Sequence, residues 1–89
     1  MKDKLMTLIG KRIKEIRQLK GLTQEQMALE ASLDLSYYNH FENGKKNISI
    51  KNLLIITKIL DIEIFEIIPP KKDLFLSKDE KNSIEILLN

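Results

Sequence analysis

The sequence has one histidine, His40, which stands next to Phe41 and is its one side chain of the type that most often acts as a catalytic base. A catalytic nucleophile needs a base and a group that orients the base, and a metal ion needs several ligands placed together. The sequence has no cysteine, and it contains no HExxH, GxSxG or glycine-rich phosphate-loop motif. We therefore interpret His40 as a surface side chain and expect a protein that is not an enzyme, with no metal site and no cofactor.

Length and composition are those of one small globular domain. The chain has 89 residues, of which 43% are hydrophobic and 31% charged, and a formal net charge of +2. This length allows a modest hydrophobic core. The first residues lack the apolar segment of a signal peptide, and no stretch reaches the roughly eighteen apolar residues of a membrane helix. We expect a cytoplasmic protein with no membrane partner.

The stretch from residue 23 to residue 44 predicts two short helices around a turn. Thr23 can cap the first helix, and Gln26 stands three residues later, as in a capping box. The segment Ser32-Leu33-Asp34 then interrupts the helical pattern, with Asp34 placed to cap a second helix from Leu35 to about Glu42. A helix, a tight turn and a second helix predict a helix-turn-helix.

Longer helices are expected on both sides of this motif. Residues 5–20 carry Leu5, Ile9, Ile13 and Ile16 at intervals of one helical face. After the motif, Ser49 can cap a helix from Ile50 to about Leu60. That helix is apolar over more than one face, which predicts that it covers a second surface.

The segment after residue 60 allows two interpretations. Residues 62–68, IEIFEII, alternate in a way that fits a strand as well as a short helix. We favour a short helix because it follows a run of helices. Pro69-Pro70 breaks the pattern. We therefore divide the chain into a domain of residues 1–68 and an elbow with a helical tail, residues 69–89.

A last short helix is expected in the tail. Ser77 and Glu80 have the spacing of a second capping box, and apolar residues follow it. A single terminal helix of this length is marginal in water, so we expect it to pack against another surface. Ile55 and Ile59, or the same surface of a second subunit, are the candidates.

One register of residues runs without a gap from Ile9 to Leu60. It comprises Ile9-Gly10, Ile13, Arg17, Gly21-Leu22-Thr23-Gln24, Ala28 and Glu42-Asn43-Gly44. In this register the chain resembles the Cro/repressor-like helix-turn-helix domains of the Xre type. The resemblance implies an all-α fold, a five-helix lambda-repressor-like DNA-binding domain, to which the sequence adds the short C-terminal helix.

A narrower resemblance rests on three segments, Ser32-Leu33-Asp34, Ser36-Tyr37 and Lys46-Asn47-Ile48-Ser49-Ile50. In these the chain is similar to the controller proteins of restriction–modification systems. It departs from the pattern at three positions. Ser32 replaces the glycine usual at the turn, Leu35 stands where the controller proteins carry a base-reading arginine, and Tyr38 replaces a branched aliphatic residue. A target sequence therefore cannot be transferred.

The resemblance implies that the second helix of the motif lies in the major groove of DNA. Three residues of this region have a simpler interpretation, since Lys45-Lys46 would also fit a solvated turn and Leu35 could pack on the core without contacting a base. By position, the side chains that would face the bases are Leu35, Ser36, Asn39 and His40. Contacts to phosphates would come from Thr23, Gln24, Tyr37, Asn43, Lys45, Lys46 and Asn47. The resemblance also implies a structural ion pair of Arg17 and Glu42.

Two functions remain open from the sequence. The first is a sequence-specific transcriptional regulator that binds double-stranded DNA as a homodimer, regulates its own gene and controls a restriction–modification system. The second is an antitoxin or another protein-interaction module, in which the apolar fourth helix and the tail bind a partner protein and DNA binding is secondary. No small-molecule ligand is expected in either case. The dimer surface would consist of Ile55, Ile59, Ile62, Ile64 and Phe65.

Overall fold

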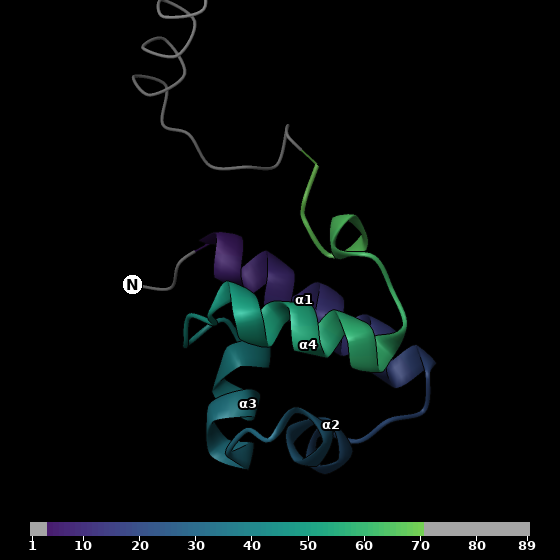
Figure 1. Cartoon of the computed structure of the whole chain (residues 1–89). Coiled ribbons are helices and arrows are strands. Elements are labelled where there is room, and N and C mark those ends of the chain that lie inside the picture. The colour runs from purple at the N-terminus through teal and green to yellow at the C-terminus, as the bar shows by residue number, and fades with distance from the viewer. Residues whose placement is uncertain (1–3, 71–89) are drawn as a thin grey trace, which may run out of the picture.

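The computed structural model describes residues 4–70. This part of the chain forms four α-helices and one 3-10 turn (Figure 1), which are α1 (Lys4–Leu19), α2 (Gln24–Ala31), α3 (Leu35–Glu42), α4 (Ile50–Leu60) and η1 (Ile64–Glu66). It contains no strand. The all-α fold and the first four expected helices are confirmed, and the expected helix after Ser77 lies outside the described residues. Within residues 4–70, no helix has the length and apolar character to span a membrane.

The predicted caps fix where the short helices begin. Thr23 Oγ1 accepts a hydrogen bond from the Gln26 N–H at 3.0 Å, and Gln26 Oε1 accepts from the Thr23 N–H at 2.8 Å. Asp34 accepts from the backbone N–H of Tyr37 at the start of α3. Ser49 does the same at the start of α4. These side chains satisfy N–H groups that have no partner within the first turn of a helix.

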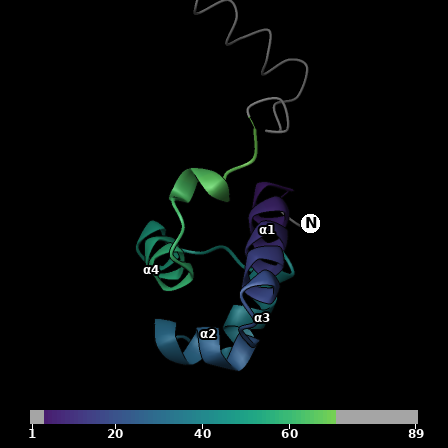
Figure 2. The same cartoon turned by 90° about the vertical axis from the view of Figure 1, so that its right-hand side faces the viewer.

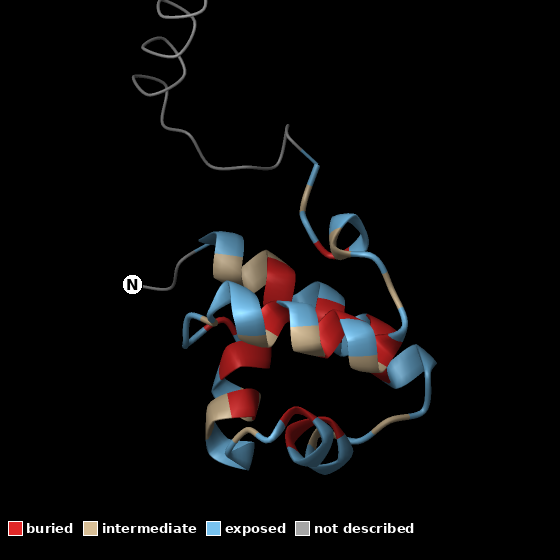
Figure 3. Cartoon of the chain, viewed as in Figure 1, coloured by how far each residue is buried: buried red, intermediate tan, exposed pale blue. Residues whose placement is uncertain are grey.

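The helices enclose one core. Figure 2 shows α2 and α3 crossing below α1 and α4. Helix α3 packs on α1 and α2, and α2 also packs on α4. The inward faces are the buried ones (Figure 3). The buried apolar side chains are Ile9, Ile13, Ile16, Met27, Ala28, Ala31, Tyr38, Phe41, Leu53, Ile56, Leu60 and Ile67.

Helix α1 approaches the end of α3 closely at Gly10. A Cβ atom at Gly10 would lie 2.5 Å from the carbonyl oxygen of Phe41 and 2.7 Å from that of Glu42. Those oxygens belong to the backbone and cannot move aside. Glycine therefore sets the distance between α1 and the last turn of α3, the helix expected to face DNA.

The expectation of a short helix over residues 62–68 is refined, because the described part of the chain has four α-helices and no fifth α-helix. Residues 62–68 form only the single 3-10 turn η1. Ile67 just after it is 1% exposed and anchors the segment in the core. Ile68 precedes Pro69, and a residue before proline is disfavoured in the α conformation. The buried side chain of Ile67 and the prolines that follow limit this segment to one turn. The division at residues 68 and 69 stays a prediction.

Helix α2 ends in a strained residue. Ser32 has φ 54° and ψ 42°, the left-handed conformation, and it is not glycine. This conformation lets the N–H of Leu33 reach the carbonyl of Ala28 at 2.8 Å and the N–H of Ser32 reach that of Leu29 at 3.1 Å. The two bonds close the helix in the manner of a Schellman motif. The departure from glycine seen in the sequence therefore falls at a position where glycine would be favoured.

We predict that Ser32→Gly stabilises the protein by about 1 kcal/mol, because glycine adopts the left-handed conformation without steric cost. Part of the gain is offset by the greater freedom of glycine in the unfolded chain. Urea unfolding of both proteins measures the difference. Ser32→Ala is the control, since alanine keeps the strain, and it should give no gain. Equal stability of Ser32→Gly and the parent would contradict the assignment of strain.

Candidate nucleic-acid interface

A buried ion pair holds the last turn of α3 against α1. Arg17 Nε donates to Glu42 Oε2 at 2.7 Å, and Arg17 Nη2 donates to Glu42 Oε1 at 3.0 Å. The third guanidinium nitrogen, Nη1, donates to the carbonyl of Leu22 at 2.7 Å. Arg17 is 7% exposed and Glu42 is 3% exposed. This is the bidentate geometry of a strong arginine–carboxylate pair. The structural pair that the family resemblance implied is therefore present.

The surroundings of the pair keep its charges in place. Hydrogen bonding to Glu42 raises the pKa of Arg17 above its ordinary value, so the guanidinium stays charged. Tyr38 lies one helical turn before Glu42 and is fully buried. Burial, together with the neighbouring Glu42, raises the pKa of the Tyr38 phenol well above its ordinary value. The phenol therefore stays neutral beside the ion pair.

Gln24 and Asn39, two of the predicted DNA-contacting residues, form a chain of hydrogen bonds that ends on the ion pair. Gln24, at the start of α2, donates from Nε2 to Glu42 Oε1 at 3.1 Å. Asn39 on α3 donates from Nδ2 to Gln24 Oε1 at 3.0 Å. Asn43 then donates from Nδ2 to the backbone carbonyl of Asn39 at 3.0 Å. Gln24 was assigned a phosphate contact alone, and the structure adds a role in joining α2 to α3.

A second link ties α3 to the loop that follows it. The Tyr37 hydroxyl donates to the backbone carbonyl of Asn47 at 2.6 Å. The hydroxyl has one hydrogen, so in this arrangement Tyr37 cannot donate it to a phosphate as well. The bond places the loop residues Lys45, Lys46 and Asn47 beside α3, where all three are exposed.

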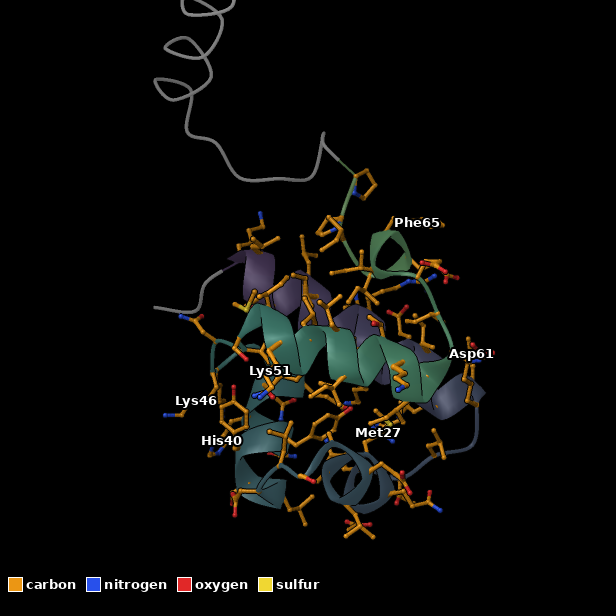
Figure 4. All side chains as sticks on the ribbon, viewed as in Figure 1. Met27, His40, Lys46, Lys51, Asp61 and Phe65 are labelled. Carbon is orange, nitrogen blue, oxygen red and sulfur yellow. The ribbon has the colours of Figure 1, made fainter. Side chains whose placement is uncertain are left out.

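The remaining predicted contact residues are open to solvent. Ser36 and His40 are exposed on α3, and Leu35 is 41% exposed, so it does not lie in the core. Figure 4 shows His40 and Lys46 projecting outward, with Phe65 at the opposite end of the molecule. Among residues 4–70, no group of three or more His, Cys, Asp or Glu side chains is placed to hold a metal ion.

The predicted dimer residues differ in how far they are exposed. Phe65 is 73% exposed, whereas Ile55, Ile59, Ile62 and Ile64 are half-buried against the core of their own chain. Helix α4 also exposes two apolar side chains that were not assigned to that surface, Ile50 at 65% and Leu54 at 50%. The apolar excess of α4 is therefore partly at the surface.

Sequence reasoning missed two residues that organise these elements. Arg12 Nε donates to the carbonyl of Glu66 at 3.1 Å, which fastens η1 to α1. The double contact of Gln24 was missed as well. No spacing in the sequence signals either bond, because each joins residues whose distance depends on how the helices cross.

Comparison with known proteins gives consistent similarities. The family model HTH_3, described as helix-turn-helix, matches residues 13–67. The control protein C.MunI of a Mycoplasma species is 41% identical over 59 residues, which span 65% of this chain and 80% of that protein. The restriction–modification controller protein C.AhdI of Aeromonas hydrophila has 40% identity and a TM-score of 0.67, over 70% of this chain and 94% of its own.

A further solved structure contains DNA. It is that of C.Esp1396I bound to a 19 base pair DNA duplex, which has 36% sequence identity to this chain and a TM-score of 0.66. The match covers 72% of this chain and 89% of that one.

We predict that Arg17→Ala lowers the free energy of unfolding by on the order of 3 kcal/mol, because it leaves the Glu42 carboxylate buried without its charged partner. Chemical denaturation measures the loss. Glu15→Gln is the control. It removes only the exposed pair of Arg12 and Glu15, whose charged atoms are 3.6 Å apart, and should cost less than about 1 kcal/mol. An Arg17→Ala protein that unfolds like the parent would show that the pair is not structural.

Proposed function

Because this chain belongs to the Xre-type helix-turn-helix family and is similar to restriction–modification controller proteins, we propose that it is a sequence-specific transcriptional regulator that binds double-stranded DNA. The observation that carries the proposal is the solved complex of a relative with a 19 base pair duplex, which shares this fold over 72% of the chain.

Helix α3 is proposed to enter the major groove. Its outward side chains include the hydroxyl of Ser36 and the imidazole of His40, and Asn39 offers its amide at the same surface. Hydroxyl, amide and imidazole groups can hydrogen-bond to base edges, and Leu35 can contact only an apolar group such as the thymine methyl. None of these side chains carries a fixed charge, so affinity must come from elsewhere.

Affinity is proposed to come from contacts to phosphates around α3. Lys45 and Lys46 stand on the exposed loop that Tyr37 holds beside the helix. Thr23 and the start of α2 lie on the other side of the motif, where the helix dipole favours an anion. The capping box engages the N–H groups of Thr23 and Gln26, so the Thr23 hydroxyl hydrogen and the backbone N–H groups of the first helical turn between them are the donors left for a phosphate. Asn43, Asn47 and Gln24 complete the set of proposed phosphate contacts. Such contacts fix position on the duplex and carry no sequence information.

We predict that the parent binds one or a few genomic fragments tightly in a gel-shift titration, with a steep salt dependence. A Lys45→Ala and Lys46→Ala double variant should bind every sequence more weakly and reduce the salt slope by about 1 per lysine removed. Lys58→Ala is the matched control, because Lys58 is exposed in the last turn of α4. Weak parental binding that tolerates any sequence would contradict the proposed function.

The protein is further proposed to act as a homodimer. A dimer would place two copies of α3 in successive major grooves about one helical turn apart. The proposed surface centres on the exposed Phe65 with Ile55, Ile59, Ile62 and Ile64 around it. Phe65 lies away from His40 and Lys46 (Figure 4), which is compatible with a dimer that leaves the proposed DNA-facing residues open.

We predict that Phe65→Ser shifts the protein toward the monomer at micromolar concentration, because it removes the most exposed apolar side chain of the proposed surface. Sedimentation velocity measures the shift. Leu29→Ser is the control, since Leu29 is 79% exposed on α2, outside that surface. A parent protein that is already monomeric at this concentration would contradict the homodimer.

The exposed apolar residues of α4 and η1 also support the second candidate, an antitoxin or interaction module that covers this surface with a partner protein. A monomer that stays soluble only with a co-expressed partner would favour it. Autoregulation and control of a restriction–modification system are the remaining parts of the proposal. A methyltransferase gene and an endonuclease gene beside this one would support them.

A further inference from the structure

A line of side-chain hydrogen bonds leads from the buried ion pair to the outer side of α3. Gln24 donates to Glu42, Asn39 donates to Gln24, and Asn43 Nδ2 lies 3.4 Å from Asn39 Oδ1. Gln24 and Asn39 are both half-buried. The hydrogen bonds therefore connect the buried Glu42 carboxylate to the Asn39 amide, which is expected to face a base.

The carboxylate at the inner end fixes the direction of the whole line. Glu42 receives two hydrogen bonds from Arg17 and one from Gln24, so its oxygens act only as acceptors. An amide can turn over and exchange its oxygen and nitrogen. The Gln24 amide cannot turn over in this way, because its Oε1 would then face an oxygen of the Glu42 carboxylate and the two acceptors would repel each other. Its Nε2 must face Glu42, and its Oε1 must face Asn39.

The same constraint passes on to Asn39. With Gln24 Oε1 as its neighbour, Asn39 must present Nδ2 to Gln24, at the observed 3.0 Å. One Nδ2 hydrogen is then committed. The atoms left for an external partner are Oδ1, with its remaining acceptor capacity, and the second Nδ2 hydrogen. Asn39 thus offers one acceptor and one donor in a fixed order.

This order matches one base better than the others. In the major groove adenine presents a donor at N6 beside an acceptor at N7. Guanine presents acceptors at O6 and N7, thymine an acceptor at O4, and cytosine a donor at N4, so none of these three pairs a donor with an acceptor. We propose that Gln24 is a positioning residue that transmits the polarity of the buried Glu42 carboxylate to Asn39, so that Asn39 selects adenine at one position of each half-site. The inference rests on the proposed function, since it requires α3 to read DNA.

The test compares base preferences of variants selected on the same randomised DNA duplex library. The parent should enrich a site that contains adenine at the position whose preference disappears in Asn39→Ala. Gln24→Met keeps the length of the side chain and removes both hydrogen bonds. It should reduce the adenine preference at that position by roughly 10-fold or more and leave the other positions unchanged. Gln18→Met, at an exposed glutamine of α1, is the matched control and should bind as the parent does.

The outcomes separate the inference from the function on which it rests. If the parent enriches a site and Gln24→Met keeps the adenine preference, the positioning role fails while the proposed function stands. A parental preference for guanine, thymine or cytosine at the Asn39 position overturns the inference in the same way. If the parent enriches no sequence, the proposed function and the inference both fail.

The orientation of the Asn39 amide can also be measured by NMR on the parent protein without DNA, so this test does not depend on whether a variant folds. Nuclear Overhauser contacts should join the Nδ2 protons of Asn39 to the side chain of Gln24, because Nδ2 faces that residue. Absence of these contacts would mean that the Asn39 amide is turned the other way or rotates freely, and would overturn the inference. Melting curves of Gln24→Met and the parent separate a change in base preference from a loss of folded protein.

Discussion

The buried ion pair of Arg17 and Glu42 is the contact on which the orientation of α3 depends. Removing two charges from water is costly, and the cost is offset only while the hydrogen bonds between them stay complete. Arg17 belongs to α1 and Glu42 to the last turn of α3, so rotation of α3 would leave both charges unpaired in the interior. The pair therefore selects one angle for the helix that is proposed to read DNA.

A steric constraint acts on the same turn of α3. The carbonyl oxygens of Phe41 and Glu42 lie so close to Gly10 that no side chain fits between the helices. Gly44 adds a second close contact, because a Cβ there would lie 2.5 Å from Thr7 Oγ1. The ion pair provides attraction, and the two glycines allow the approach that brings its atoms within hydrogen-bond distance. Each would be ineffective without the other.

The sequence predicted the local structure better than the contacts between helices. Thr23, Asp34 and Ser49 cap through bonds to the next few residues, so their types and spacing were enough to place α2, α3 and α4. The Arg17 and Glu42 pair was expected only through a family resemblance. The bond between Gln24 and Asn39 was not expected, since an amide chooses its partner by geometry that appears only when α2 and α3 have packed.

One segment could not be assigned from its local pattern alone, because tertiary packing decides its conformation. Residues 62–68 alternate like a strand, yet burial of Ile67 and the prolines that follow leave room for one 3-10 turn. The apolar pattern indicates that some side chains face the core, but a strand and a short helix can both place them there.

The outward side chains Leu35, Ser36, Asn39 and His40 of α3 include no lysine or arginine. In the proposed complex with DNA, the orientation of the Asn39 amide is therefore the main source of specificity at its position. An arginine presents only hydrogen-bond donors, whichever way its side chain turns. An amide carries a donor and an acceptor, and which of the two faces a base depends on how the amide is oriented. In this chain the group that can fix it is the carboxylate of Glu42, which is already held by Arg17. Under this proposal, stability and specificity depend on the same buried charge, and base-pair positions that no side chain contacts are open to selection by DNA shape.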